Sequence, residues 1–312
     1  MTCPLRGIDG RNPCGFLAAL GALRLLSDHR RCEEPHLHWT GGAAGAMQPT
    51  LSFAAGKGEE QVASLIMEAH ERRDLDAELG WERDLMKISS DQARNILLPL
   101  LTDAATLRAA QTVGACVVDV PRRRGAGVDR DRLTPYTPLR LIPRVGRARF
   151  LATAFSISRS VSKNQIRTAL FGPWEYERAN SMRWDPGAPP SLRAYSAEAP
   201  THFGPLGVPG AVALATAGLS YFPLVATEGG KATCHGFSEP NARTLRWPLW
   251  SSPLEESATR LTLGIPAIYE EPRNDDLLAR HGIFARVSAR RERLGEDDQM
   301  LSWGDVEMIG AD

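Results

Sequence analysis

The sequence lacks the long apolar run that a membrane-spanning helix needs. No stretch approaches roughly 18 consecutive apolar residues, and the opening residues, MTCPLRGIDG, have neither the basic start nor the apolar centre of a signal peptide. Cysteine is scarce as well, since only five are spread along the chain, at Cys3, Cys14, Cys32, Cys116 and Cys234. An odd number of widely spaced cysteines suits reduced thiols better than a disulfide framework. These absences predict a cytoplasmic protein that contacts no membrane.

The fingerprints of common enzymes and metal sites are also missing. His36 with His38, and Cys234 with His235, are isolated pairs that have no C-x-x-C or H-E-x-x-H companion. No G-x-S-x-G nucleophile motif occurs, and GRNPCG lacks the G-K-[ST] ending of a phosphate-binding loop. The sequence therefore predicts no catalytic residue, no metal and no cofactor. One alternative stays open: a metal-dependent nuclease or RNA-processing enzyme whose dispersed acidic or His residues converge only in the fold.

The formal net charge of the chain is zero, but one segment is strongly positive. Residues 121–167 contain eleven Arg and one Lys against Asp129 and Asp131, a local net charge of 12 − 2 = +10, so the rest of the chain carries −10. Guanidinium groups at this density repel one another unless a polyanion or an acidic protein surface lies opposite. A nucleic-acid contact is favoured. The alternatives are a docking surface for a partner protein and a solvated surface with scattered ion pairs.

The basic segment predicts a long loop followed by a short helix. Residues 121–148 are rich in Gly, Pro and Arg and separate two β-rich runs, TVGACVVDV and RFLATAFSIS, which we expect to be strands. Ser162 is expected to cap a helix, KNQIRTALFG, with Ile166, Ala169 and Leu170 facing inward. Guanidinium groups suit phosphates, while amide side chains near a helix start suit base edges. The candidate nucleic-acid-binding residues are Arg122, Arg123, Arg124, Arg130, Arg132, Arg159, Lys163, Asn164, Gln165 and Arg167.

The remaining segments predict a mixed α+β fold. Asn12 and Pro13 begin a helix that runs through CGFLAALGALRLL, whose small residues allow another element to approach closely. HLHWTGG and QPTLSFA predict strands, residues 59–72 predict a helix, and Ser89 or Ser90 is expected to cap a further helix that Pro99 interrupts. We expect an N-terminal αβ/helical part over residues 1–112 and a β-rich part with the basic loop and short helices over residues 113–312, or one continuous domain.

Two blocks of the sequence carry a family resemblance. The first is NPCGFLAALGALRLLSDHR, followed by a short linker and HLHW; the second is MRWDPGAPPSLRAYSAEAP, continuing into PGAVALATAGLSYFPL. Together they resemble the small large-subunit proteins of type I-U, also called type I-G, CRISPR effector complexes. In that family a Pro-containing turn leads into a Leu/Ala/Gly helix and a Trp-containing strand. An Arg-x-Asp-Pro turn, a Gly-Ala-x-x-Leu-Ala helix and an aromatic-Pro strand follow later. The matching residues of the second block are Arg183, Asp185, Pro186, Gly210, Ala211, Leu214, Ala215, Gly218 and Pro223.

The resemblance implies a non-catalytic subunit of a crRNA-guided surveillance complex that acts in antiviral defence. Such proteins recognise the short protospacer-adjacent motif (PAM) in duplex DNA, help to separate the strands and help to recruit a helicase-nuclease. The implied partners are crRNA, target double-stranded DNA, the Cascade backbone subunits and the subunit that binds the crRNA 5′ end. Guide pairing supplies most of the sequence specificity, so the protein reads a few base pairs and holds phosphates. No PAM-reading residue carries over individually, because residues 121–167 have no aligned match in the family.

Overall fold

The computed structural model of the protein describes most of the chain, including the N-terminal and C-terminal sheets and the helices between them. The described residues are 2–42, 45–81, 85–120, 133–141, 149–179, 181–188, 206–227, 231–237, 243–293 and 299–310, together with the backbone of 122–124 and 127–129. The helices are α1 (Pro13–Ser27), α2 (Glu59–Glu71), α3 (Leu75–Leu79), α4 (Ser90–Thr102), α5 (Leu107–Cys116), α6 (Phe150–Ser160), α7 (Lys163–Phe171), α8 (Pro209–Gly218), α9 (Glu256–Leu263) and α10 (Asp275–Arg280). The strands are β1 (Thr2–Pro4), β2 (His36–Gly41), β3 (Met47–Ser52), β4 (Arg122–Arg124), β5 (Gly127–Asp129), β6 (Glu177–Arg178), β7 (Leu206–Gly207), β8 (Leu224–Thr227), β9 (Lys231–Cys234), β10 (Thr244–Trp250), β11 (Ile283–Arg293), β12 (Gln299–Leu301) and β13 (Asp305–Met308). The predicted α+β class is confirmed.

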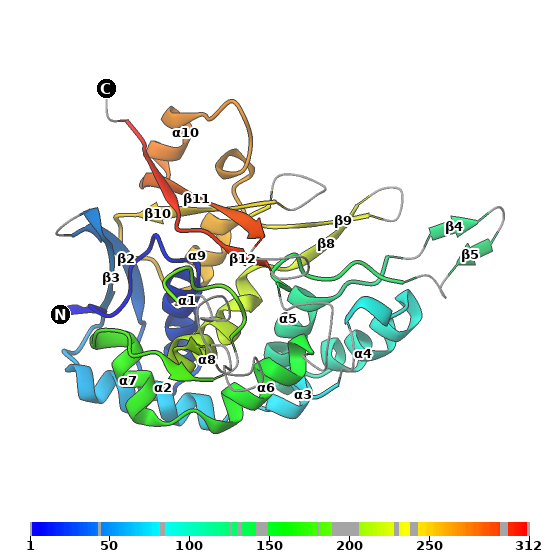
Figure 1. Ribbon diagram of the computed structural model, residues 1–312, viewed down its shortest axis with the longest axis horizontal. Coiled ribbons are helices and arrows are strands. Elements are labelled where there is room, and N and C mark those ends of the chain that lie inside the picture. Colours follow the sequence, from blue (N-terminus) through cyan, green and yellow to red (C-terminus); the bar gives the residue numbers. More distant parts are fainter. Residues whose placement is uncertain are drawn as a thin grey trace, which may run out of the picture.

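Helix α1 lies at the centre of the molecule, packed against α8 (Figure 1). The Asn12 side chain accepts a hydrogen bond from the backbone N–H of Cys14 at 2.9 Å, and Pro13 occupies the first turn, as predicted. A Cβ atom added to Gly21 would lie 1.8 Å from the Leu214 carbonyl oxygen, so only glycine allows α8 to approach this closely. Gly218 of α8 meets the Leu17 carbonyl of α1 in the same way. The prediction that the small residues of this helix admit a close neighbour is confirmed.

Two antiparallel sheets cover α1 on one side. The N-terminal sheet has the order β1-β3-β2, and the C-terminal sheet has the order β10-β11-β12, with β13 also paired to β11. Figure 1 shows these sheets on one side of α1 and helices α2, α6 and α7 on the other. Phe16 of α1 stacks between Trp39 and Trp247, at centroid distances of 5.5 and 5.4 Å. The indole N–H of Trp250 donates to the Leu37 carbonyl at 2.7 Å. Aromatic packing therefore joins both sheets to the central helix.

The described core does not divide at residue 112. One cluster of buried apolar side chains includes Leu20 before that position and Leu214 after it. The position itself falls inside α5. Among the described residues no helix combines the length and the apolar character needed to cross a membrane.

Several elements match the sequence-based predictions, and two do not. The strands β2 and β3, the helix α2 and the helix α7 with its Ser162 cap are confirmed. The prediction of two β-rich runs around the basic segment is wrong: TVGACVV lies mainly at the end of α5, and FLATAFSIS lies in α6. In α6 the buried Phe150, Leu151, Ala154 and Ile157 follow helical spacing, so packing overrides the β propensity of the composition. The basic segment thus connects two helices.

Pro99 does not interrupt its helix. Helix α4 begins after the predicted Ser89 cap and continues through Pro99 to Thr102. Pro99 lies in the last turn of the helix and has no backbone N–H to donate to the carbonyl of Asn95. Both Asn95 and Pro99 are exposed. Solvent can satisfy that carbonyl, so the cost of the proline is tolerated.

A buried ionic cluster fixes α3 and α5 to the central helix. Glu78 of α3 accepts a hydrogen bond from Arg73 at 2.8 Å and another from the Thr112 hydroxyl of α5 at 2.8 Å. Arg24 of α1 lies 3.6 Å from the same carboxylate and donates to the Thr112 hydroxyl oxygen at 3.0 Å. Burial alone would raise the pKa of Glu78, but the Arg73 and Arg24 guanidinium groups lower it to about 2. The carboxylate is therefore ionised within the core.

Candidate nucleic-acid interface

The first part of the basic segment forms a β-hairpin at one end of the molecule. Strands β4 and β5 pair antiparallel, with Arg122 opposite Asp129 and Arg124 opposite Gly127. Figure 1 shows this hairpin at the opposite end of the longest axis from α7. The side chains of Arg122, Arg123 and Arg124, and all of Arg130 and Arg132, lie outside the described residues. The hairpin places three successive arginine positions on one short strand.

The chain that follows the hairpin is anchored to the helical part of the fold. Leu133 forms a β-bridge with Ser89, just before α4, and Tyr136 forms one with Val117, just after α5. The indole N–H of the buried Trp184 donates to the Leu139 carbonyl at 2.8 Å. These contacts fix the base of the hairpin to the body of the protein.

The start of α7 is stabilised by a capping box. The Ser162 hydroxyl oxygen accepts from the Gln165 backbone N–H at 3.3 Å, and the Gln165 side-chain oxygen accepts from the Ser162 backbone N–H at 2.9 Å. The side-chain amide of Gln165 donates to Glu177 of β6 at 2.9 Å. Both ends of the Gln165 amide are therefore used within the protein. A contact between Gln165 and a base would have to replace the bond to Glu177.

The two cations of α7 share one carboxylate. Lys163 and Arg167 lie one helical turn apart, and both form ion pairs with Glu60 of α2, with 3.4 Å between the Arg167 Nε and the Glu60 Oε2. The ammonium of Lys163 is the main cause that lowers the pKa of Glu60. All three side chains remain about half exposed, at 44 % for Lys163, 48 % for Arg167 and 63 % for Glu60. The pair of cations is therefore accessible to a partner.

The other two candidates near α7 point to solvent without ion pairs. Asn164 is exposed, and its side chain makes no hydrogen bond with the described residues. Arg159, at the end of α6, is exposed and lies over the Phe155 ring, with its guanidinium carbon 5.6 Å from the centroid. The structure thus brings Arg159, Lys163, Asn164 and Arg167 to neighbouring positions on α6 and α7. It does not bring them to the hairpin, so these four candidates are separate from the strand that holds Arg122, Arg123 and Arg124.

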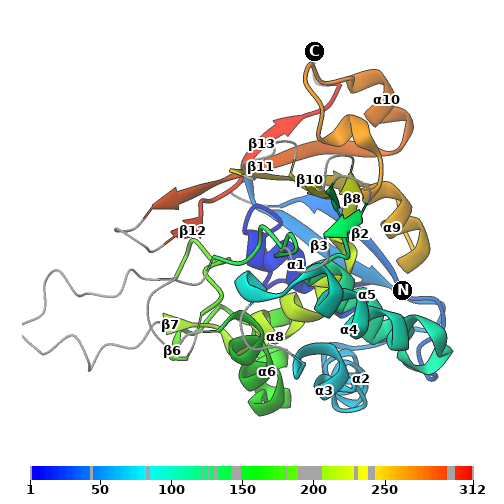
Figure 2. The same ribbon diagram turned by 90° about the vertical axis from the view of Figure 1, so that its right-hand side faces the viewer.

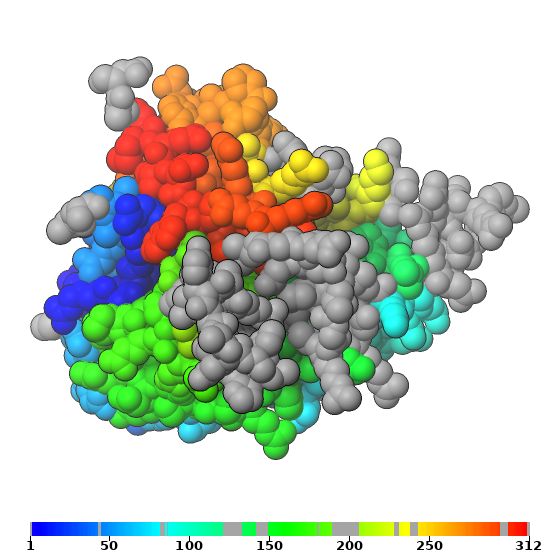
Figure 3. Space-filling model, in the orientation of Figure 1, coloured from blue at the N-terminus to red at the C-terminus, as the bar shows by residue number. Residues whose placement is uncertain are grey.

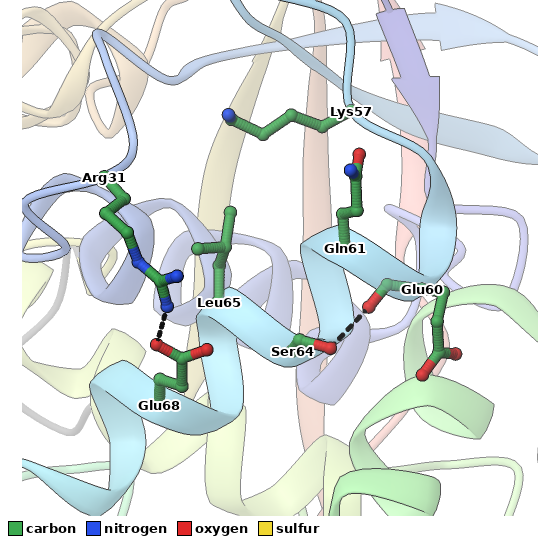
Figure 4. Close-up of a pocket in the computed structure, with 7 residues that line it drawn as sticks. All are labelled: Arg31, Lys57, Glu60, Gln61, Ser64, Leu65 and Glu68. Carbon is green, nitrogen blue, oxygen red and sulfur yellow. Dashed lines mark hydrogen bonds and ion pairs between the residues drawn. The ribbon is translucent and has the colours of Figure 1, made fainter.

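A pocket of about 310 Å³ lies on the other side of Glu60 (Figure 4). Its lining includes two cations and two carboxylates, so it favours neither sign of charge, and Leu65 supplies the apolar part of the wall; the full lining is Arg31, Lys57, Glu60, Gln61, Ser64, Leu65 and Glu68. Arg31 reaches towards Glu68, with which it forms an ion pair. Figure 4 shows the Glu60 side chain turned away from Lys57 and towards α7, which is drawn in green. Glu60 was not among the predicted residues.

The two sequence blocks that carry the family resemblance meet in the core. The Asn12 side-chain amide donates to the Asp185 carboxylate at 2.7 Å, and the Cys14 backbone N–H donates to the Trp184 carbonyl at 3.2 Å. The Gly187 backbone N–H donates to the same Asp185 oxygen at 2.9 Å. Burial raises the pKa of Asp185, while the bonds from Asn12 and Gly187 act in the opposite direction. The Asn-Pro turn and the Arg-x-Asp-Pro turn are thus one structural unit.

The histidine and cysteine pairs noted in the sequence do not gather into a metal centre within the described part of the chain. No group of three or more His, Cys, Asp and Glu residues among the described positions is arranged to hold a metal ion. The buried Cys234 thiol donates to the Phe222 carbonyl at 3.4 Å, and the His235 ring stacks on Tyr269 with centroids 6.4 Å apart. Both residues have packing contacts.

Comparison of the sequence with protein-family models and with curated proteins, and of the fold with solved structures, finds no match.

Proposed function

We propose that this protein is a non-catalytic large subunit of a crRNA-guided type I CRISPR surveillance complex. In this role it contacts target DNA beside the protospacer, where it takes part in PAM recognition and strand separation and helps to recruit the helicase-nuclease. Its partners are crRNA, target double-stranded DNA, the Cascade backbone subunits and the subunit at the crRNA 5′ end. The proposed location is the cytoplasm.

The observation that supports this proposal is the union of the two resembling blocks. They lie far apart in the sequence, yet Asn12 binds Asp185 directly, and α1 packs on α8 through Gly21 and Gly218. The two blocks match a family pattern, and they also depend on one another for packing. Together they indicate a scaffold shared with that family more strongly than two motifs without mutual contact would. Fold alone does not assign a function.

The basic groups supply the chemistry that the proposed function needs. Phosphate contacts from Arg and Lys provide most of the affinity for nucleic acid and little sequence preference. The hairpin with Arg122–Arg124 and helix α7 with Lys163 and Arg167 lie at opposite ends of the molecule (Figure 1). A duplex that touches both groups has to follow the longest axis.

The test is reconstitution of the surveillance complex with and without this chain. Duplex targets with the correct flanking motif and with a scrambled motif are compared in a binding assay. We expect the complex to distinguish the two targets only when this chain is present. Equal discrimination without the chain would count against the proposal.

The alternative enzyme function has its own assay. The isolated chain is incubated with labelled DNA and RNA in the presence of Mg²⁺ or Mn²⁺, with and without EDTA. Cleavage that EDTA abolishes, and that is lost on mutation of a carboxylate cluster, would replace the proposed role with that of a metal-dependent nuclease. A protein-docking adaptor is the remaining alternative, and its binding to partner subunits would survive removal of all nucleic acid.

A further inference from the structure

The ion pairs between α2 and α7 suggest how the basic α7 surface is regulated. We propose that Glu60 forms ion pairs with Lys163 and Arg167 in the free protein and that phosphates of bound nucleic acid displace the Glu60 carboxylate from these cations. Glu60 then lowers the affinity of this surface for nucleic acid without removing its cations. This inference rests on the proposed nucleic-acid contact of α7 and adds a competing group within the protein.

The geometry gives one carboxylate to two cations. Lys163 and Arg167 are separated by four residues and so project from the same face of α7. Glu60 approaches them from the first turn of α2, on a neighbouring helix (Figures 1 and 4). Among the described residues, Glu60 is the carboxylate that forms ion pairs with both cations, which leaves a net charge of 2 − 1 = +1 on the group. In the space-filling view, the green surface of residues around 150–180 adjoins the light blue surface of α2 (Figure 3).

The ion pairs are exposed, and exposed ion pairs are weak. All three side chains keep about half of their surface in contact with solvent. Solvent and salt screen such pairs, so they add little to stability. A nucleic-acid strand offers a closely spaced row of phosphates and releases condensed counterions when cations bind it. Phosphates can therefore replace the single carboxylate.

A second carboxylate on α2 provides a matched control. Glu71 lies eleven residues after Glu60, about three helical turns along and on the same face. Its side chain is exposed and forms no ion pair with a described residue. Glu60→Gln and Glu71→Gln change the net charge equally, but only the first releases Lys163 and Arg167.

The experiment measures binding of the full-length chain to a labelled duplex DNA of about 30 base pairs at low and moderate salt. The variants are Glu60→Gln, Glu71→Gln and the double substitution Lys163→Ala with Arg167→Ala, the last alone and combined with Glu60→Gln. We expect Glu60→Gln to lower the Kd about twofold to fivefold relative to Glu71→Gln at low salt, with a smaller difference at higher salt. The gain should vanish when both cations are replaced. Thermal unfolding of every variant checks that the fold is kept.

Different outcomes separate this inference from the proposed function. Equal affinities of Glu60→Gln and Glu71→Gln, or a gain that persists without Lys163 and Arg167, would overturn the role of Glu60 while leaving the proposed function to its own test in the assembled complex. Loss of affinity in Glu60→Gln would mean that the ion pairs only hold α7 against α2, which also overturns the inference. If neither the isolated chain nor the assembled complex binds DNA, in the wild type or in any of these variants, both the inference and the proposed function fail.

Discussion

Replacement of Glu78 by Gln removes the negative charge at the centre of the buried cluster while nearly keeping the shape of the side chain. Glu78 is 2 % exposed and accepts hydrogen bonds from Arg73 and Thr112. In the variant, the buried guanidinium groups of Arg24 and Arg73 lose the carboxylate that compensates them. Breaking a buried ionic group from one side is strongly destabilising, because the remaining charge stays desolvated.

The size and the pH dependence of this effect follow from the pKa of Glu78. The folded protein lowers it from 4.5 to about 2. The carboxylate therefore contributes stability that is fully present above pH 4.5 and is lost as the pH falls through the folded value near 2. A shift of this size corresponds to about 3 kcal/mol at pH 7 and about 1 kcal/mol at pH 3. The difference in the free energy of unfolding between wild type and Glu78→Gln should therefore shrink by about 2 kcal/mol between pH 7 and pH 3.

The assay is urea unfolding of both proteins at pH 7 and at pH 3, with Glu71→Gln as the control. The exposed Glu71 has no ion pair with a described residue, so its variant should stay within about 0.5 kcal/mol of wild type at both values of pH. A Glu78→Gln variant that loses less than about 1 kcal/mol at pH 7, or that loses the same amount at both pH values, would refute the assignment of Glu78 as an ionised group in the core.

Two further predictions concern the central helices. Gly21→Ala should destabilise the protein by about 2 kcal/mol or more in urea unfolding, because the new Cβ would lie 1.8 Å from the Leu214 carbonyl oxygen. Gly114→Ala, in the last turn of α5 with open space around its Cβ, should instead stabilise the protein by up to about 1 kcal/mol. Similar effects of the two changes would contradict the packing of α1 on α8. Asn12→Ala removes both a helix cap and a donor to the buried Asp185, so the same measurement should show a loss of about 2–4 kcal/mol, whereas a loss below about 1 kcal/mol would show that the Asn12–Asp185 bond does not join the two blocks.

Local signals predicted the elements whose ends are marked by capping residues. Asn12 with Pro13 and Ser162 with Gln165 each fix a helix start through hydrogen bonds within a few residues, so α1 and α7 could be read from sequence. Helix α6 has no side-chain cap, and its aromatic and β-branched residues resemble a strand in composition. Its helical burial pattern becomes decisive only once the neighbouring elements are in place.

The candidate site shows the same limit. The cationic character of the hairpin and of α7 is visible in the sequence, because charge density is a local property. The pairing of Lys163 and Arg167 with Glu60 joins helices that are distant along the chain, and nothing near Glu60 in the sequence indicates its partners. The distance between the β4–β5 hairpin and α7 is likewise a consequence of the tertiary fold (Figure 1). Figure 2 shows the same fold turned by 90°.

The most direct test of the proposed nucleic-acid contact is the salt dependence of duplex binding by the assembled complex, measured for wild type and for the triple variant Arg122→Ala, Arg123→Ala, Arg124→Ala. Targets with matched and scrambled flanking motifs are both titrated, and Asn164→Ala is measured in parallel. We predict that the triple variant binds both targets more weakly and that its salt dependence is flatter by roughly one slope unit for each lost phosphate contact. Asn164→Ala should instead narrow the difference between the two targets by about 1–3 kcal/mol. A triple variant that keeps the wild-type slope would contradict the account, and the hairpin would then be a surface for a partner protein.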